Sequence, residues 1–415
     1  MKKLGAYPVY LVLSGTTTFA STLMFTVLAV YYVRAVGMSP LQLVLVGTVL
    51  EVTILIFEIP TGVVADTFSR RLSVIVGTLI LGAAFILESS FALVGVVLLA
   101  EAIRGVGETF LSGATDAWLA DEVGEDAVGR VYQRAAQLDR AVAILGTVAS
   151  VGLASIALNL PVLIGGVLYL ALGVFMICCM PERGFQPTPR EERGSWRAMF
   201  GTLREGAHVV RRSPILLSLI GVSLVTGAAS EGFDRLWEAH LLTNFSLPHL
   251  GALDPVVWFG IINGGTEVAS LVVAAIFRRR LDAASQHSAA TARALLGLSA
   301  ISILGALVFA LAGHFAVALA ALGVRAVVGS LIGPLYRTWL VRQIDAPTRA
   351  TVLSISSQAN ALGQAGIGPA IGAVGNVSLR AALTVAAVLF TPALALFARS
   401  LRHEQQSAEL LSETV

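Results

Sequence analysis

Apolar stretches long enough to cross a bilayer recur along the whole chain, and they constrain its fold more than any other feature. A membrane-spanning helix needs about 20 mostly apolar residues. Only 13% of the residues are charged, whereas soluble domains carry about 25% charged residues. The sequence therefore predicts an all-α, polytopic membrane protein with twelve transmembrane helices, at residues 8–34, 39–66, 72–88, 91–121, 131–156, 160–180, 214–242, 254–277, 291–312, 315–342, 349–375 and 379–400.

One long polar connection separates the sixth predicted span from the seventh. It is rich in proline, glycine and charged residues, which is typical of a linker. We therefore expect an N-terminal six-helix bundle at residues 1–181, a linker at 182–213, a C-terminal six-helix bundle at 214–400 and a tail at 401–415. A short amphipathic helix is expected within the linker, around residues 196–210.

The basic residues gather on one side of the predicted spans. Lys2, Lys3, the linker arginines and Arg402 lie on that side, whereas the loop TNFSLPHLGALDP on the other side has no lysine or arginine. By the positive-inside rule, the linker and both termini are expected in the cytoplasm. We therefore expect a multi-pass protein of the cell (inner) membrane. Because the basic residues sit in short loops, the net charge of +2 does not indicate a nucleic-acid partner.

The two predicted halves resemble each other weakly. LAEAIRGVG in the fourth span matches LAALGVRAVVG in the tenth, which aligns Arg104 with Arg325. Glu51 in the second span aligns with Glu267 in the eighth, and AAQ in the fifth span aligns with SSQ in the eleventh. Three matches in the same order favour two pseudo-symmetric bundles, which is how many secondary transporters are built.

The loop after the second span reads GVVADTFSRR. It resembles the signature of the major facilitator superfamily (MFS), which is roughly G-x-L-A-D-r-x-G-r-[KR]. Thr67 and Ser69 depart from that pattern, and the matching positions are Gly62, Val64, Ala65, Asp66, Arg70 and Arg71. The resemblance covers the whole chain in topology, and it implies the MFS fold and transport by alternating access.

The resemblance also implies a conformational latch. In the superfamily, the matching aspartate faces the N-terminus of the eleventh span, and the matching arginine pairs with an acid that ends the fourth span. Here Asp66 would face residues 346–350, where a carboxylate gains about 0.3–1 kcal/mol, and Arg70 would pair with Asp121 or Glu122. The alternative is that the two arginines only satisfy the positive-inside rule. The candidate latch residues are Gly62, Asp66, Arg70, Arg71 and Asp121.

Charged residues within the predicted spans point to function. Glu101, Arg104 and Glu108 are spaced i, i+3, i+7 and therefore share one helix face. A charge at mid-bilayer costs about 2.5–3.5 kcal/mol, so such residues must pair or line a wet cavity. The deep set contains three arginines (Arg104, Arg235, Arg325) and seven acids (Glu51, Glu58, Glu101, Glu108, Glu231, Asp234, Glu267).

The excess of acids over bases favours a transport role for this set. Desolvation favours the protonated form of a carboxyl group, and a reversible proton carrier needs such a group. The purely structural alternative is that Arg104 pairs with Glu101 or Glu108 and fixes helix packing, and we favour a structural role for Arg235, Asp139 and Arg140. The candidate substrate and proton pathway comprises Glu51, Glu58, Glu101, Arg104, Glu108, Glu231, Asp234, Glu267 and Arg325.

These features predict a proton-coupled transporter that exports amphipathic or cationic drug-like molecules. The eleventh span, ALGQAGIGPAIGAVG, is similar to the antiporter motif of MFS drug exporters, although that motif lies in their fifth span, and close helix packing also explains its glycines. Proton-coupled uptake of a small solute is the alternative. A membrane enzyme or receptor is a remote alternative, because the six histidines lie in loops or near span ends and no metal-ligand spacing appears. The expected partners are a small-molecule substrate, protons and the lipid bilayer, with no cofactor or metal, and the expected state is a monomer.

Overall fold

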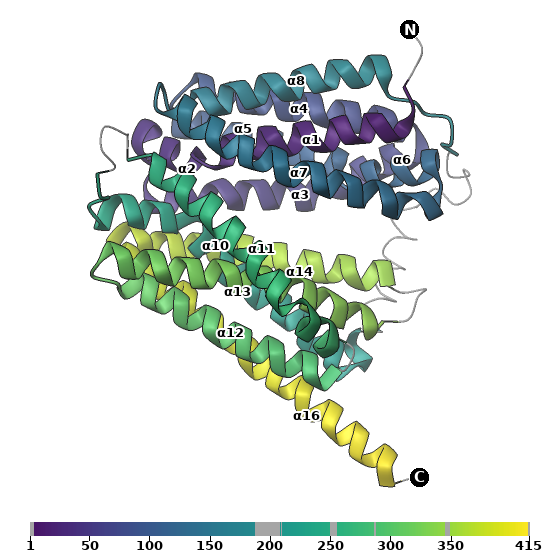
Figure 1. Ribbon diagram of the computed structural model, residues 1–415, viewed down its shortest axis with the longest axis vertical. Coiled ribbons are helices and arrows are strands. Elements are labelled where there is room, and N and C mark those ends of the chain that lie inside the picture. The colour runs from purple at the N-terminus through teal and green to yellow at the C-terminus, as the bar shows by residue number, and fades with distance from the viewer. Residues whose placement is uncertain are drawn as a thin grey trace. The chain divides into compact units, whose positions relative to one another are not determined.

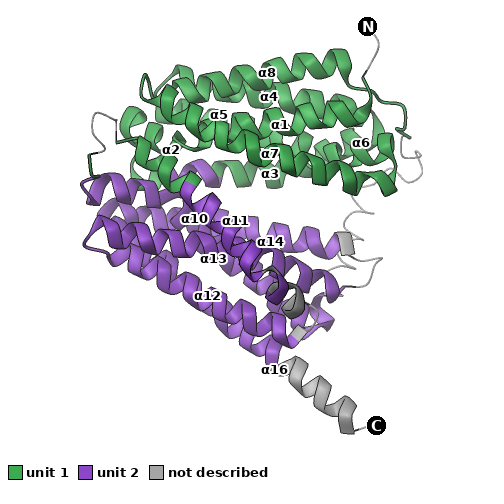
Figure 2. Ribbon diagram, in the orientation of Figure 1, with its two compact units in different colours: residues 1–42, 49–194, 248–264 green, residues 43–48, 195–247, 265–415 purple. Residues whose placement is uncertain are grey.

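The computed structural model describes residues 4–186, 208, 210–249, 255–285, 288–344 and 349–413, and every regular element within these ranges is helical (Figure 1). The chain divides into two compact units (Figure 2). Unit 1 comprises residues 1–42, 49–194 and 248–264, and unit 2 comprises residues 43–48, 195–247 and 265–415. The expected linker helix around residues 196–210 lies outside the described residues, apart from His208 and Val210.

Each unit contains several long helices. The helices of unit 1 are α1 (Ala6–Phe25), α2 (Leu28–Tyr31), the π-helix η1 (Tyr32–Val36), most of α3 (Pro40–Thr67), α4 (Arg70–Ser90), α5 (Val94–Leu111), α6 (Ala114–Val123), α7 (Glu125–Ala154) and α8 (Leu160–Cys179). The helices of unit 2 are α10 (Pro214–Asn244), most of α11 (Val257–Ser285), α12 (Ser288–Leu311), α13 (Phe315–Arg342), α14 (Arg349–Val377), α15 (Leu379–Leu389) and α16 (Thr391–Glu413).

The predicted spans agree with these helices, but three of them are interrupted: the first between α1 and α2, the fourth between α5 and α6, and the last between α15 and α16. Among the described residues, ten single or joined helices are long and apolar enough to cross a membrane. The other two predicted spans fall on α14 and on α5, which carries three charged residues among its 18. The prediction of one continuous helix over residues 91–121 was wrong, because α5 ends at Leu111 and α6 starts at Ala114. Gly113 lies at the break with φ +71° and ψ −35°, a conformation that glycine adopts more readily than other residues.

Serine side chains mark the starts of several helices. Ser39 and Gln42 form a reciprocal capping box at the start of α3, and Pro40 follows Ser39 directly. Ser69, Ser213 and Ser378 each accept a hydrogen bond from a backbone N–H in the first turn of α4, α10 and α15. These caps satisfy backbone donors that have no partner within the helix. They explain why α3, α4, α10 and α15 begin at these residues.

Glycines let α4 approach its neighbours in unit 1 closely. α4 packs against both α5 and α8. A Cβ atom on Gly77 would lie 2.7 Å from the carbonyl oxygen of Gly107 on α5, and one on Gly82 would lie 2.9 Å from that of Gly166 on α8. Small residues are typical of helix interfaces within membranes, where van der Waals packing replaces the hydrophobic effect. α4 is therefore tightly held along its length.

Glycines also let α10 and α14 approach each other closely in unit 2. Gly227 on α10 and Gly363 on α14 leave no room for a Cβ atom, because each faces a backbone carbonyl of the other helix. Around Gly366, by contrast, there is open space. Gly363 in the eleventh predicted span therefore serves close helix packing, which is the structural explanation of part of that glycine-rich sequence.

Candidate functional site

Arg104 of α5 lies in a buried cluster of unit 1. Its Nη2 atom is 2.7 Å from Oε2 of Glu101, one helical turn earlier, and both side chains are buried. The guanidinium group also lies over the rings of Phe25 and Phe85, at 5.4 and 5.7 Å from their centroids, where cation–π attraction stabilises it. Glu108, on the same stripe of α5, is exposed. Of the two acids considered as partners for Arg104, the structure thus places Glu101 against it.

Two further side chains, Tyr32 and Glu88, complete this cluster, and no sequence pattern indicated either of them. The hydroxyl group of Tyr32 in η1 contacts Oε1 of Glu88 on α4 and lies 3.2 Å from Oε1 of Glu101. The hydroxyl of Tyr31 donates to the backbone carbonyl of Glu88 at 3.0 Å. Glu88 lies at the end of a predicted span, where an acid is unremarkable, and tyrosines near span ends are common in membrane proteins.

Unit 2 contains a second set of charged side chains, on α10 and α13. Nε of Arg235 lies 3.0 Å from Oε1 of Glu231, and Nη2 of Arg325 lies 3.3 Å from Oδ1 of Asp234. The Arg325 guanidinium is stacked on the Phe233 ring, 3.6 Å from its centroid. The two arginines aligned by the internal repeat, Arg104 and Arg325, thus both lie on aromatic rings. Their acidic partners differ, because Arg104 pairs within its own helix and Arg325 pairs across to α10.

A cavity of about 410 Å³ lies in unit 2 beside the Asp234–Arg325 pair. Hydroxyl groups from Ser223, Thr226, Ser230, Ser299 and Ser302 line it. Its other lining residues include Asp234, Arg325, Tyr336, Asn360, Phe390 and Phe397. The cavity therefore combines one acid, one base, many hydrogen-bonding groups and three aromatic rings, a mixture suited to a small polar or amphipathic ligand.

The polar side of this cavity is organised by a small network. The hydroxyls of Tyr336 and Ser223 lie 2.8 Å apart, and those of Ser223 and Ser356 lie 2.7 Å apart. Asn360 donates from its side-chain amide to the backbone carbonyl of Ser223 at 3.1 Å, and Gln364 donates to the Asn360 side chain at 2.8 Å. The sequence does not indicate this network, because isolated hydroxyl residues in apolar helices usually bond to their own backbone.

The remaining pathway candidates lie on α3 and α11. Glu51 and Glu58 are half-buried on α3, and Glu267 is exposed on α11. Asp139 on α7 accepts a hydrogen bond from the Ser14 hydroxyl of α1 at 2.7 Å. This hydrogen bond joins α7 to α1, and the structural role of Asp139 stays a prediction.

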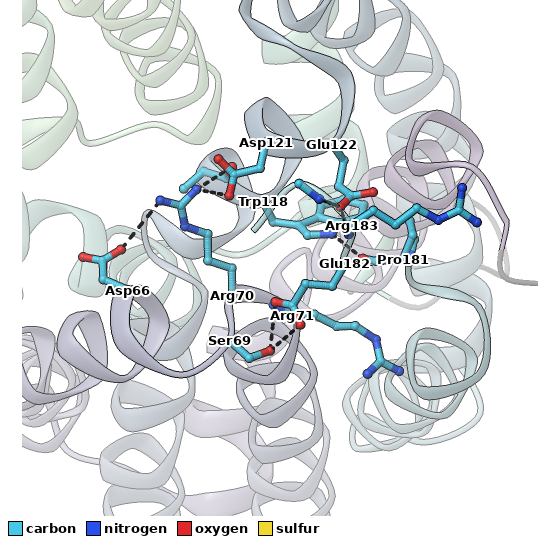
Figure 3. A network of polar contacts seen from close by, with 12 residues as sticks. Asp66, Ser69, Arg70, Arg71, Trp118, Asp121, Glu122, Pro181, Glu182 and Arg183 are labelled. Atoms are coloured by element: carbon cyan, nitrogen blue, oxygen red, sulfur yellow. Dashed lines mark hydrogen bonds and ion pairs between the residues drawn. The ribbon is translucent and has the colours of Figure 1, made fainter. Parts of the chain in front are cut away.

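The candidate latch residues lie in unit 1 at the loop between α3 and α4 (Figure 3). Arg70 forms an ion pair with Asp121 of α6 and donates to the backbone carbonyl of Ala117 at 3.0 Å. Its Nη2 atom is 3.9 Å from Asp66, whose side chain is 60% exposed. Gly62 has open space around it. The expected partner of Asp66, at residues 346–350, lies largely outside the described residues.

Glu182, just after α8, joins this network although the sequence placed it in the linker. It accepts hydrogen bonds from the Ser69 hydroxyl at 2.8 and 2.9 Å and from the backbone N–H of Arg71 at 2.9 Å (Figure 3). Arg71 in turn donates to the backbone carbonyls of Met180 and Ile177 at 2.9 and 2.6 Å. Ser69 and Arg71 thereby tie the start of α4 to the end of α8.

Glu122 has a different role from the one considered for it. Its carboxylate accepts hydrogen bonds from the backbone N–H groups of Arg183 and Gly184, the latter at 2.8 Å. The Trp118 indole N–H donates to the Pro181 carbonyl at 2.8 Å (Figure 3). Of the two acids considered as partners for Arg70, the structure thus places Asp121 against it and leaves Glu122 to the segment after α8.

Comparison with known proteins identifies the family. The model of the Major Facilitator Superfamily matches residues 10–365. The chain belongs to this superfamily. A related protein of Bacillus subtilis (strain 168), the uncharacterized MFS-type transporter YxaM, is 24% identical over 262 residues, which span 62% of this chain and 63% of the relative.

Solved structures of transporters share the fold of this MFS chain. The nucleoside transporter NupG superposes with a TM-score of 0.73 at 13% identity, over 96% of this chain and 99% of its own. A POT family transporter in complex with a thioalcohol-conjugated peptide gives 0.70 at 13% identity, over 96% of both chains. A bacterial homologue of the human lysosomal transporter Spinster gives 0.66 at 14% identity, over 95% and 97% of the two chains. The chain is thus a member of the MFS with helices long and apolar enough to cross a membrane, and these distant likenesses show its fold.

Proposed function

We propose that this chain is a proton-coupled secondary transporter and that the cavity of unit 2 holds part of its cargo. The observation that carries the proposal is the Asp234–Arg325 ion pair at the wall of that cavity. The Asp234 side chain is 58% exposed, whereas that of Arg325 is 16% exposed. A carboxylate that lies 3.3 Å from its arginine and is still largely exposed can exchange that arginine for a proton or for a cationic cargo.

Export of amphipathic or cationic molecules is the first candidate for the cargo. The exposed carboxylate of Asp234 attracts a cation, and Phe390 and Phe397 offer aromatic surface in the same cavity. Cation–π contacts with such rings contribute about 0.5–2 kcal/mol, depending on how far water is excluded. Exchange of the cation for a proton at one carboxylate couples export to the proton gradient.

Uptake of a small polar solute is the second candidate, and the hydroxyl lining of the cavity favours it. Ser223, Tyr336 and Asn360 form a connected network there, and such networks recognise hydroxyl or amide groups of a ligand. The fold is shared with a nucleoside transporter and a peptide-bound POT transporter. Nucleosides and short peptides are therefore suitable probes for this second class.

The test uses the purified chain in proteoliposomes with an imposed pH gradient of either sign. The probes are a fluorescent lipophilic cation, a labelled nucleoside and a labelled dipeptide. We expect one of them to accumulate only with the gradient, and we expect Asp234→Asn to abolish the response to the gradient while exchange at equal pH survives. Asp126→Asn, at an exposed acid in the first turn of α7, is the matched control.

The remaining coupling candidates are tested in the same assay. Glu231→Gln, Glu51→Gln and Glu267→Gln each replace one carboxyl by its neutral isostere. Gradient-driven transport by Asp234→Asn at the parental rate would disprove the role of the ion pair. If all four variants respond to the gradient like the parent, these carboxyls do not couple proton and cargo.

A further inference from the structure

Three buried oxygen-bearing side chains of unit 1 meet at the end of α4 that lies away from the α3–α4 loop. Glu88 is the third-last residue of α4, Glu101 lies on α5, and Tyr32 opens η1. Their exposed fractions are 1%, 1% and 3%. The Tyr32 hydroxyl contacts Oε1 of Glu88 on one side and lies 3.2 Å from Oε1 of Glu101 on the other. One hydroxyl thus bridges two carboxyl groups in a buried site.

Counting hydrogens shows what this arrangement needs. Two oxygen–oxygen contacts are both hydrogen bonds only if two hydrogens lie between the three oxygens. The tyrosine hydroxyl supplies one hydrogen, and an ionised carboxylate supplies none. The second hydrogen must come from a carboxyl group in its protonated form. With both carboxyls ionised, one contact would bring two oxygens together with no hydrogen between them, which is costly for buried polar groups.

Other charged and titratable groups surround the three side chains. Arg104 pairs with the second oxygen of Glu101 at 2.7 Å, and that pair offsets one negative charge. Glu108 lies in electrostatic range of both Arg104 and Glu101, and Tyr169 on α8 in range of Arg104 and Glu108. The other groups on the neighbouring elements are Tyr31, Arg34 and, on α3, Glu51.

The segment that carries Tyr32 is built differently from the rest of the first span. α1 ends at Phe25, Val27 has φ −129° and ψ 1°, and residues 32–36 wind as a π-helix. Single π-helical turns occur frequently at functional sites. The break separates Tyr32 from the long α1 helix, so its hydroxyl is positioned by the contacts of a short segment.

We propose that Glu88, Tyr32 and Glu101 form a binding site for one exchangeable proton, shared between the two carboxyls through the tyrosine hydroxyl. A proton from water adds to a carboxylate oxygen and makes both contacts hydrogen bonds; its departure leaves one contact without a hydrogen and loosens the hold of Tyr32 on α4 and α5. The use of this site in transport rests on the proposed proton coupling, whereas its existence does not.

The test is infrared difference spectroscopy on the full chain in lipid, comparing acidic with alkaline buffer in H2O and D2O. A protonated carboxyl gives a C=O stretching band that shifts in D2O. We expect the titrating bands of the parent to include one that belongs to this site and disappears as the buffer becomes alkaline. Glu88→Gln is expected to abolish it, and Tyr32→Phe is expected to shift its frequency because the hydroxyl contact is lost. Asp126→Asn, at an exposed acid, is expected to leave the band unchanged.

Three outcomes decide the matter. Loss of the band in Glu88→Gln or Glu101→Gln, with a frequency shift in Tyr32→Phe, supports the site. A set of titrating bands that keeps its parental intensities and frequencies in all three variants overturns it, as does the absence of any titrating band in the parent. Tyr32→Phe keeps both carboxyls and Arg104, so it remains informative if a glutamine variant fails to fold. A titrating band in a chain whose transport ignores the gradient would overturn the proposed coupling and leave the proton site standing.

Discussion

At the scale of single residues, the buried carboxylate of Glu101 depends on Arg104 for its counter-charge. Arg104→Ala leaves the buried Glu101 without the guanidinium at 2.7 Å, and breaking a buried pair from one side costs about 3–5 kcal/mol. We expect the variant to insert into the membrane, to unfold at a lower temperature than the parent and to lose transport. Thermal unfolding in detergent and the proteoliposome assay measure the two effects.

A double variant separates charge from packing at this site. Adding Glu101→Gln to Arg104→Ala removes the stranded negative charge, so part of the lost stability is expected to return. Recovery of stability without recovery of transport would mark Arg104 as needed for the transport cycle itself. Parental stability in the single variant Arg104→Ala would contradict the argument from burial.

Two aspartates near Arg70 are expected to behave differently. The Asp66 side chain is 60% exposed and 3.9 Å from Arg70, whereas Asp121 is in direct contact with it and 26% exposed. Asp66→Asn is therefore expected to leave the unfolding temperature unchanged, while Asp121→Asn lowers the free energy of unfolding by about 1 kcal/mol. Under the proposed latch role, Asp66→Asn slows turnover with cargo binding little changed. Misfolding of Asp66→Asn with loss of binding would make the residue structural.

Residues of the site could be predicted from the sequence where a family motif or a helical spacing included them. Arg70 and Asp121 followed from the resemblance, and the charged stripe of α5 followed from helical spacing. Glu88 and Tyr336 did not, because one acid at a span end and one tyrosine in a span carry no periodic signal. Their importance arises from side chains on other helices, and hydropathy does not fix how each helix is rotated about its axis.

At the scale of elements, the break between α5 and α6 depends on the backbone of Gly113. With φ +71° and open space around its α-carbon, Gly113→Ala meets no side-chain clash, so its cost of about 1–3 kcal/mol comes from the backbone alone. Gly129, inside α7 and also in open space, is the matched control. Gly129→Ala is expected to be neutral or to raise stability, by up to about 1 kcal/mol. Equal unfolding temperatures for both variants would contradict the argument.

The start of α4 is expected to depend on an acid from outside that helix. Glu182→Ala removes the acceptor of both the Ser69 hydroxyl and the Arg71 backbone N–H, and loss of such a contact costs about 0.5–2 kcal/mol. The control is Glu125→Gln, at an exposed acid in the first turn of α7. Chemical or thermal unfolding measures both. A loss in Glu182→Ala no larger than in the control would remove Glu182 from the structural network.

The elements themselves were largely predictable, for a physical reason. A helix in lipid must satisfy its own backbone groups over about 20 residues, so α8 and α13 lie close to where hydropathy placed them. The division of the fourth span was not predictable in the same way. Ser112 and Gly113 are small residues that membrane helices also use for packing, and nothing in their sequence distinguishes a break from an interface.

At the scale of the whole molecule, the orientation in the membrane remains a prediction from the basic residues. Twelve spans place both termini on one side, and the positive-inside rule makes that side the cytoplasm. A fluorescent protein fused after residue 415 is therefore expected to fluoresce in cells, and a secreted phosphatase fused at the same point is expected to be inactive. The reverse pattern would show that the chain is inserted the other way or has an odd number of spans.

In unit 1, α4 carries the contacts of Arg70 and Arg71 at its start and those of Glu88 at its end, and this has a mechanical consequence. α4 has 21 residues, which make a rod of about 30 Å, with Arg70 at its first turn and Glu88 at its last. At its glycines, α4 is packed against the backbones of α5 and α8 too closely for a Cβ atom to fit between them. A displacement that breaks the contacts of Arg70 must therefore either move Glu88 as well or bend the helix. The contacts at the two ends of α4 are thus mechanically coupled through the helix.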